Sequence, residues 1–432
     1  MYLVTIHVPT YTDGPDRLSV ATDWYRSLVL LRDSFSGRFG TLAVLAPSLP
    51  VTENRSAQKL HEVNESRDGI RLIPSFDNRA RARTYWIGGA RKRWKADLAR
   101  HASAADVVHA GVGDVYRPIG FDGFRAGLAF GKTTVFVQDT DIVLQNQELS
   151  RGQGLYWRCR TKLYSAAYAR LVRSGVARAD VSLLKGTTLL KRYGGYAKNA
   201  KVFHDTSYSR AEIVGRDAVA ERIRTQQSGR AMRFVYCGRF IPRKGIDHGI
   251  RIVRAARDLG ADVGFDLIGE GPQQTELTSL VNELGVRQHV RFLGSVPYGP
   301  ELIRRLATYD GLLFTPLAED TPRMIFDGYA AALPLVAYDI EYVKERAAEE
   351  RATFDLPRND VKTSAERIAK LAKNRGQLTE LTNAAHAAAE THCAESWYRR
   401  RAEWTIEAHE RRRVEPVSIP TLVPSPGTPG EG

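Results

Sequence analysis

Residues 311–339 predict a complete βαβ unit, and this unit constrains the fold more than any other part of the chain. Residues 311–317 and 334–338 are short apolar runs typical of buried parallel strands. Residues 322–332 between them have the pattern of a helix. Two strands joined by a helix are the building block of an α/β fold.

The helix of this unit is expected to start with a cap. Thr321 is suited to the N-cap position and Pro322 to the first helical position. The backbone amides of the next three residues, Arg323, Met324 and Ile325, would then point toward a ligand above the strand ends. The stretch therefore predicts an anion site, such as a site for phosphate.

Two carboxylates accompany this predicted anion site. Glu319 lies in the loop before the helix, and Asp327 follows eight positions later. Because an ionised carboxylate only accepts hydrogen bonds, both suit hydroxyl groups of a ribose or a hexose better than a phosphate. An acidic loop followed by a solvated aspartate is the alternative for this stretch.

Length and composition fit a globular protein with two domains. The chain has 432 residues, 43% of them hydrophobic, and no apolar run reaches the roughly 18 residues of a membrane-spanning helix. Its N-terminus lacks the charged and apolar regions of a signal peptide, so we expect a cytoplasmic location. The three cysteines, Cys159, Cys237 and Cys393, are too far apart in sequence to suggest a disulfide framework or a zinc site.

The charge of the chain favours an anionic partner. The net charge is +14, which attracts nucleotides, lipid headgroups, polysaccharides or nucleic acids, and charge alone does not choose among them. Between residues 79 and 100, many arginines and lysines alternate with Tyr85, Trp86 and Trp94. Such a helix could bind the inner face of an anionic membrane, or it could be a solvated face whose rings pack inward.

Strands and helices alternate along most of the chain, which predicts two doubly wound domains. The predicted divisions are a first domain over residues 1–212, a linker over 213–230, a second domain over 231–394, a basic helix over 395–413 that packs back on the first domain, and a disordered tail over 414–432.

A second loop of the second domain carries two cations. Arg239 and Lys244 lie between Gly238 and Gly245, so the chain can turn tightly while both cations reach over the end of a strand. Two cations beside a helix N-terminus suit a diphosphate, whose negative charge grows when it is a leaving group. Together with Glu319 and Asp327 of the acidic stretch, the loop predicts a site that binds a diphosphate beside sugar hydroxyls.

Two further loops are candidates for donor contacts. Gly14 follows the first strand, at a place where the backbone can approach a ligand closely. Val296 lies after Gly294 in a loop that offers mostly backbone contacts, which would select the nucleotide base. Loops that follow parallel strands converge at one edge of the sheet, so these sites should meet in space.

With these motifs in hand, the second half resembles the retaining glycosyltransferases of the GT-B fold, specifically family 4. The resemblance rests on GRFIPRKG, LIGEGP, VRFLG and the acidic motif followed by PLVAYD, in family order between residues 233 and 340. It implies two Rossmann-like domains that face a cleft, with a C-terminal helix crossing back to the first domain.

The resemblance also implies roles for single residues. Arg239 and Lys244 would hold the diphosphate, and Glu319 would contact the transferred sugar, so these three are the expected catalytic residues. Asp327 stands where the family usually has a second glutamate that holds the ribose.

The sequence departs from the family pattern at two places in the donor and acceptor regions. Asp320 and Pro322 replace two glycines that usually follow the first glutamate, so one amide donor is missing. In the first domain, Gln138 and Asp139 stand where a histidine is usual near the reacting sugar. His109 also ends a strand on the acceptor side, like His204, and each suits a structural role better than a catalytic one.

The leading hypothesis is a transferase that moves a hexose from a nucleotide-sugar to a lipid-linked, polysaccharide or small-molecule acceptor. Retention of configuration is implied by the resemblance, with the leaving diphosphate as the base and with no metal or other cofactor. An epimerase or an inverting transferase on the same fold would need an acid or base such as Asp139 or His109. A non-catalytic binder of an anionic polymer is the alternative from another class, and nucleic acid is not an expected partner.

Overall fold

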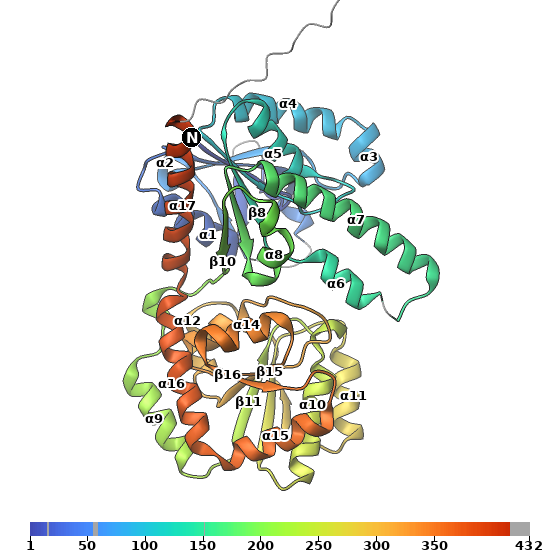
Figure 1. Ribbon diagram of the computed structural model, residues 1–432, viewed down its shortest axis with the longest axis vertical. Helices are drawn as coiled ribbons and strands as arrows, with labels where there is room; N and C mark the ends of the chain where they lie inside the picture. The colour runs from blue at the N-terminus through green and yellow to red at the C-terminus, as the bar shows by residue number, and fades with distance from the viewer. Residues whose placement is uncertain (15–16, 55–58, 151, 415–432) are drawn as a thin grey trace, which may run out of the picture.

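The computed structural model describes residues 1–14, 17–54, 59–150 and 152–414 and shows two α/β domains joined end to end (Figure 1). The N-terminal domain occupies the upper half of that view, and the C-terminal domain the lower half. Each is built on a largely parallel sheet with helices on its faces, which confirms the predicted fold class. Among the described residues, no helix is both long enough and apolar enough to cross a bilayer.

The sheet of the N-terminal domain has the strand order β10-β9-β8-β7-β1-β4-β2-β3-β5, and β6 also pairs with β4. Its strands are β1 (Tyr2–Thr5), β2 (Thr10–Thr12), β3 (Leu18–Ala21), β4 (Leu42–Pro50), β5 (Leu60–Glu62), β6 (Ile70–Asp77), β7 (Val107–Gly111), β8 (Thr133–Gln138), β9 (Val181–Lys185) and β10 (Ala200–Phe203). The centre of the sheet, from β10 to β1 and β4, is parallel and almost fully buried. A buried parallel sheet needs a helix between successive strands, as the alternating sequence pattern predicts.

Helices cover both faces of this sheet. They are α1 (Thr22–Ser34), α2 (Glu65–Asp68), α3 (Ala82–Ile87), α4 (Ala90–Ser103), α5 (Ile119–Ala129), α6 (Ile142–Leu149), α7 (Leu155–Arg178) and α8 (Gly186–Tyr193). The long α7 and the shorter α6 contact each other and form a hairpin that projects beside the C-terminal domain (Figure 1). This hairpin and the antiparallel pairing of β3 with β2 and β5 are additions to the doubly wound pattern.

The sheet of the C-terminal domain is parallel throughout, in the order β13-β12-β11-β14-β15-β16. Its strands are β11 (Met232–Cys237), β12 (Val263–Ile268), β13 (Val290–Phe292), β14 (Gly311–Phe314), β15 (Leu335–Tyr338) and β16 (Thr353–Leu356). Its helices are α9 (Arg216–Gln227), α10 (Ile246–Asp258), α11 (Gln274–Glu283), α12 (Pro300–Leu306), α13 (Met324–Ala330), α14 (Glu341–Glu350), α15 (Val361–Lys373) and α16 (Arg375–Thr391). The predicted βαβ unit is therefore present as β14, α13 and β15.

The expected linker over residues 213–230 is wrong, because most of it forms helix α9 of the C-terminal domain. Arg222 of this helix is buried, and its guanidinium donates to the carbonyls of Ala331 and Ala332. Gln226, one turn after Arg222 on the same face of α9, is also buried although it is polar. The helix lacks an apolar period because polar side chains supply its buried face, so the sequence pattern concealed it.

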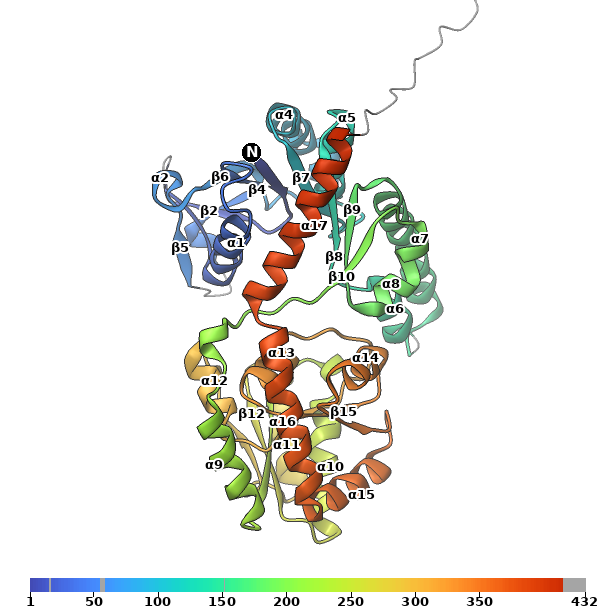
Figure 2. The same ribbon diagram turned by 60° about the vertical axis from the view of Figure 1, so that its left-hand side comes forward.

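Helix α17 (Ala394–Val414) crosses back from the C-terminal domain to the N-terminal domain (Figure 2). It packs against α1 and the ends of β8, β9 and β10. Near its end Arg412 pairs with Asp180 at 2.8 Å, and His409 lies 2.8 Å from the Thr133 hydroxyl. Val414 is its last residue, and the tail predicted over 414–432 otherwise lies outside the described residues.

The basic segment of residues 79–100 forms α3 and α4, which are separated by Gly88 and Gly89. Tyr85 and Trp94 are fully buried in the core, while Trp86 is 49% exposed. Two of the three rings therefore stabilise the domain and do not face outward.

Candidate functional site

The loops that follow β11, β12 and β14 meet at one edge of the C-terminal sheet, as predicted. The amide of Phe240 donates to the carbonyl of Glu270, which joins the first two loops. The amide of Leu317 donates to the carbonyl of Arg243, which joins the first loop to the acidic stretch. This edge is where open parallel sheets hold their ligands.

Two glycines make this close approach possible. Gly245 has a φ of 61°, and a Cβ there would lie 2.0 Å from the carbonyl oxygen of Thr315. Gly269 has a φ of 132°, and a Cβ there would lie 2.0 Å from the carbonyl oxygen of Gly238. Any other residue would push the loops apart at both positions.

The two expected diphosphate cations have different surroundings. The side chain of Arg239 is exposed, whereas Lys244 is buried and its ammonium binds the carboxylate of Asp320. Asp320 also pairs with Arg243 at 3.0 Å. Burial lowers the pKa of Lys244, and burial alone would raise that of Asp320, but the two cations outweigh it and lower the pKa of Asp320. The acid that replaces a family glycine thus neutralises part of the predicted donor site.

Glu319 is buried and caps a helix that the sequence pattern did not connect to it. Its carboxylate accepts hydrogen bonds from the amides of Glu341 at 3.1 Å and Tyr342 at 2.9 Å, in the first turn of α14. A carboxylate is stabilised there by the free amides and the dipole of the helix. Any role of Glu319 toward a sugar is in addition to this structural one.

The expected start of the helix after Glu319 is wrong. The helix begins at Met324, Arg323 occupies the N-cap position, and neither Thr321 nor Pro322 is part of it. The Ile325 amide lies 3.4 Å from the carbonyl oxygen of Pro322, so the three amides do not form the expected open row. The side chains of Met324 and Ile325 belong to the hydrophobic core, and only that of Arg323 faces the space between the domains.

Asp327 is buried rather than solvated. Burial raises the pKa of its carboxyl group to about 7, against the opposing effects of the Arg323 charge and the Tyr298 hydroxyl. Its Oδ1 atom and the Tyr298 hydroxyl have no hydrogen-bond partner within the described parts of the chain. The Tyr298 hydroxyl acts on this carboxyl, but the two groups do not meet the geometry of a formed hydrogen bond, so a ligand hydroxyl between them could complete both.

A cavity of about 970 Å³ lies between the two domains. The C-terminal domain contributes Pro297, Tyr298 and Arg323 to its wall. The first domain contributes His7, His109, Asp139 and Asp205 among others, and α17 contributes Tyr398 and Arg401. The cavity therefore joins candidate donor and acceptor residues from both halves of the chain.

On the acceptor side the structure divides the predicted residues. Asp139 lines the cavity, whereas Gln138 is buried and donates to Thr140 and to the Tyr168 hydroxyl, so its expected acceptor contact is wrong. His109 also lines the cavity and lies 2.8 Å from the hydroxyl of Tyr2. Burial lowers the pKa of His109 to about 3, so its ring is neutral.

His7 lines the same cavity and was not expected from the sequence. Burial lowers its pKa, while the carboxylate of Asp139 acts in the opposite direction and places the two groups near each other. A Cβ on Gly113 would lie 2.5 Å from the His7 ring, so that glycine leaves room for it. His7 has no local motif, because Asp139 comes near it only when the loops after β1 and β8, two strands separated by β7, meet at the edge of the folded sheet.

The two remaining donor candidates have less support. Gly14 is exposed in the turn between β2 and β3 and is not among the residues that line the cavity. Val296 packs against the core of the C-terminal domain, and its neighbours Pro297 and Tyr298 face the cavity instead. The loop after Gly294 thus reaches the cavity as predicted, but Pro297 and Tyr298 line the cavity in place of Val296.

His204, Glu345 and Glu349 have the spacing of a metal site among the described residues. Arg346 pairs with both carboxylates, and the Thr187 hydroxyl also donates to Glu345. Burial lowers the pKa of His204, and its ring lies 3.0 Å from the Tyr342 hydroxyl. The cluster connects the domains through the hydrogen bonds of Thr187 with Glu345 and of His204 with Tyr342, and both of its acids already pair with Arg346 of the same helix.

Residues 220–389 match the family model described as glycosyl transferases group 1. This segment holds the convergent loops, the Lys244 pair and the acidic stretch. The C-terminal domain is thus similar to group 1 glycosyl transferases.

Curated relatives match part of the chain. The chain is 30% identical over 178 residues to an exopolysaccharide phosphotransferase of Streptomyces coelicolor, which is 39% of this chain and 18% of that protein. It is 32% identical over 102 residues to a lipopolysaccharide core biosynthesis glycosyltransferase, LpsD, of Rhizobium meliloti, which is 23% of this chain and 27% of that protein. The matches span less than a third of the length of these relatives.

Solved structures extend the likeness to the whole chain. HepE of Anabaena in complex with UDP superposes with a TM-score of 0.64 at 14% identity, over 94% of this chain and 99% of that one. Likeness at this identity shows the fold alone, and the fold of this glycosyltransferase domain and its partner domain is GT-B.

Proposed function

We propose that this protein transfers a hexose from a nucleotide-sugar, held by the C-terminal domain, to an acceptor held by the N-terminal domain. The observation that carries the proposal is the group 1 segment whose Arg239 loop, Lys244 and Asp327 lie on one edge of the C-terminal sheet. The cavity between the domains supplies the enclosed space for the reaction. The nucleotide-sugar is the co-substrate, and the mechanism requires no metal.

In this proposal the diphosphate binds between Arg239 and Lys244. Asp320 holds Lys244 until the donor arrives, and the diphosphate then competes with this carboxylate for the ammonium. A diphosphate carries more charge than one carboxylate and gains charge as it leaves, so the exchange favours the transition state.

Asp327 is proposed to hold the ribose, because its Oδ1 atom is unpartnered and buried beside Tyr298. A ribose hydroxyl would complete both groups. Glu319 is proposed to contact the sugar while it keeps the first turn of α14 in place.

We propose retention of configuration, with the leaving diphosphate accepting the proton of the acceptor hydroxyl. The pair of His7 and Asp139 favours a second candidate, an inverting transfer, because a neutral histidine beside a carboxylate is a suitable base. The anomeric configuration of the product, read by NMR, separates the two. An inverted product together with an inactive His7→Ala variant would select the second mechanism.

The acceptor class is proposed to be a growing polysaccharide or a lipid-linked saccharide in envelope or exopolysaccharide synthesis. Support comes from the relatives, whose names place them in exopolysaccharide and lipopolysaccharide core biosynthesis. An association with the inner face of a membrane would follow from a lipid-linked acceptor.

The decisive experiment is a calorimetric titration of UDP, GDP, ADP and their hexose derivatives into the full chain. We expect one nucleotide series to bind and its hexose derivative to be turned over. Asp327→Ala should weaken both ligands of that series by about 1.5–3 kcal/mol, because a charged buried hydrogen bond is lost. Glu319→Ala should affect mainly the hexose derivative. Absence of binding by every series would refute the proposed donor site.

A further inference from the structure

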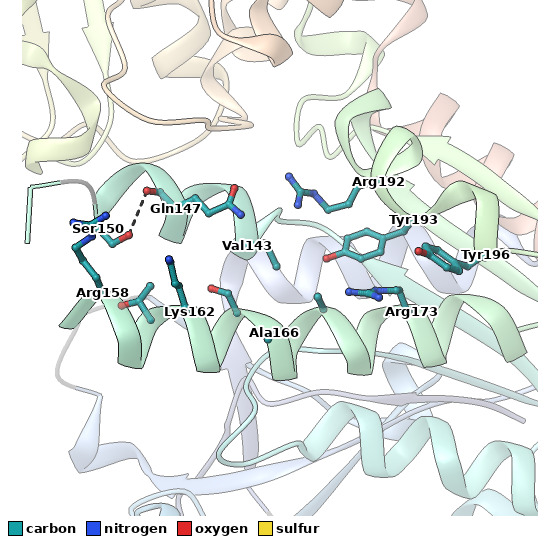
Figure 3. A pocket seen from close by; sticks show the side chains of 13 residues that line it. Val143, Gln147, Ser150, Arg158, Lys162, Ala166, Arg173, Arg192, Tyr193 and Tyr196 are labelled. Carbon is teal, nitrogen blue, oxygen red and sulfur yellow. Dashed lines mark hydrogen bonds between the residues drawn. The ribbon is translucent and has the colours of Figure 1, made fainter. Parts of the chain in front are cut away.

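A second cavity lies within the N-terminal domain, between the α6–α7 hairpin and α8 (Figure 3). Its volume is about 550 Å³. Four cations line it: Arg158, Lys162 and Arg173 from α7, and Arg192 from α8. Among the described residues that line it there is no carboxylate, and Asp141, just outside the lining, pairs with Arg192 and acts on Tyr193, so the cavity carries a net positive charge.

Three of these cations lack a partner of opposite charge. Arg192 pairs with Asp141 at 2.7 Å, whereas Arg158, Lys162 and Arg173 form no ion pair with any described residue. Arg158 and Lys162 lie on adjacent turns of α7, whereas Arg173 lies eleven residues beyond Lys162, at the end of the cavity that holds Tyr193 (Figure 3). All three are exposed, so water screens them, and only Arg173 lies near Arg192, on the other side of the Tyr193 ring (Figure 3).

A buried hydroxyl points into the same space. Tyr193 is 2% exposed, and its hydroxyl has no hydrogen-bond partner among the described residues. In Figure 3 this hydroxyl is directed toward the middle of the cavity, above Arg173. Burial raises the pKa of Tyr193 to about 12, so the hydroxyl keeps its proton and can donate it to an anion.

This second cavity adjoins the loop after β8, which also borders the cavity between the domains. Arg192 binds Asp141, which follows Asp139 by two residues in the loop after β8, and Asp139 lines the cavity between the domains. A molecule held beside Arg192 would thus lie next to the loop that borders the place of transfer.

We infer that this cavity binds a phosphate group of the acceptor. The inference rests on the proposed function and names its substrate as a phosphorylated saccharide. Arg173, Arg192 and the Tyr193 hydroxyl converge at one end of the cavity and suit a phosphate monoester, which carries nearly two charges and several acceptor oxygens, and Lys162 and Arg158 extend the positive charge along α7. The phosphate has two sources, a soluble sugar phosphate or a polyprenyl phosphate in a membrane. Leu155, Tyr156 and Trp157, exposed at the outer end of α7, suit the second source.

The test compares two double variants with the same change of charge on the same helix. Arg158→Glu with Arg173→Glu reverses cations that line the cavity, and Arg160→Glu with Arg170→Glu reverses cations of α7 that do not line it. The probes are glucose 6-phosphate, glucose, and phosphatidylcholine vesicles with and without undecaprenyl phosphate. UDP binding is measured on the same samples.

We expect wild-type protein to bind a phosphorylated probe and not its neutral counterpart, and the first double variant to bind it at least about tenfold more weakly. The control should differ from wild type by less than about twofold. Tyr193→Phe should weaken binding without lowering the melting temperature, because it removes a hydroxyl without a protein partner. Binding to glucose 6-phosphate identifies the soluble source, and binding only to the phosphate-bearing vesicles identifies the lipid source.

Equal losses in both double variants, or no preference of wild type for any phosphorylated probe, would overturn the inference. The two proposals fail separately. Phosphate binding without any nucleotide binding would support the phosphate cavity and refute the donor site. Nucleotide binding without phosphate binding would support the donor site and refute the phosphate cavity.

Discussion

The two domains hold their candidate substrate-binding cations in opposite ways. In the C-terminal domain Lys244 is buried, and Asp320 neutralises it within the protein itself. In the N-terminal domain Arg158 and Arg173 are exposed, and they have no acidic partner among the described residues. Lys244 therefore has an anionic partner without a ligand, and a bound diphosphate must displace the carboxylate of Asp320 from it. Arg158 and Arg173 of α7 gain an anionic partner only when a ligand binds.

The largest effect is expected from Lys244→Ala. The substitution removes a buried charge whose value grows as the diphosphate leaves, so turnover should fall by about 100-fold or more. Arg239→Ala should cost about tenfold, because this exposed cation is screened by water. Steady-state kinetics measure both, with the exposed Arg251→Ala of α10 as the control. Wild-type rates in the Lys244 variant would place the diphosphate elsewhere.

Asp327→Asn tests the buried acid of the donor side through pH. The folded pKa of Asp327 is about 7, well above the ordinary value of 3.8. The folded state therefore holds a proton that the unfolded state has lost, and this acid makes the free energy of unfolding fall as the pH rises from about 4 to 7. The asparagine variant lacks this dependence and should gain stability over wild type across that window, by on the order of a few kcal/mol.

Urea unfolding at several pH values across the window measures the difference. Asp262→Asn, at an exposed position before β12, serves as the control. Stability curves of wild type and Asp327→Asn that stay parallel would show that this carboxyl is ionised in the folded protein.

Asp320→Asn sharpens the comparison between the domains most directly. The substitution keeps the shape of the side chain but removes the negative charge that pairs with Lys244 and Arg243. The cations of the donor site then lack this acidic partner, as Arg158 and Arg173 do among the described residues of the N-terminal domain. Affinity for the nucleoside diphosphate should rise by about tenfold, as expected when a competing charged contact is removed. Calorimetry measures this, and weaker binding would mean that Asp320 positions Lys244 for the donor rather than competing with it.

The sequence predicted best what lies within one βα unit. The loop from Gly238 to Gly245 and the unit from residue 311 to residue 339 carry their own spacing, so strand, loop and helix followed from local patterns. Their meeting at one sheet edge followed from the general rule for parallel strands. The fold class and the place of the candidate donor site were therefore predictable.

Pairings between distant residues were not predictable. Lys244 and Asp320 are 76 positions apart, and the amides that bind Glu319 lie more than 20 positions beyond it. Helix α9 was missed because Arg222 buries its charge against carbonyl groups instead of showing an apolar period. His7 comes near Asp139 only when the sheet forms and brings the loops after β1 and β8, on either side of β7, to the same edge.

The smallest effect is expected on α4, where many cations are also exposed but line neither cavity. Lys92→Glu with Lys95→Glu reverses two of them, and Trp94 between them is fully buried, so the aromatic side of the helix is not available to a bilayer. We expect the free energy of unfolding to stay within about 0.5 kcal/mol of wild type, as for most surface changes. Co-sedimentation with anionic vesicles should be equally unaffected. Loss of co-sedimentation would instead make α4 a membrane-binding surface, and exposed cations without a built cavity would then have a function of their own.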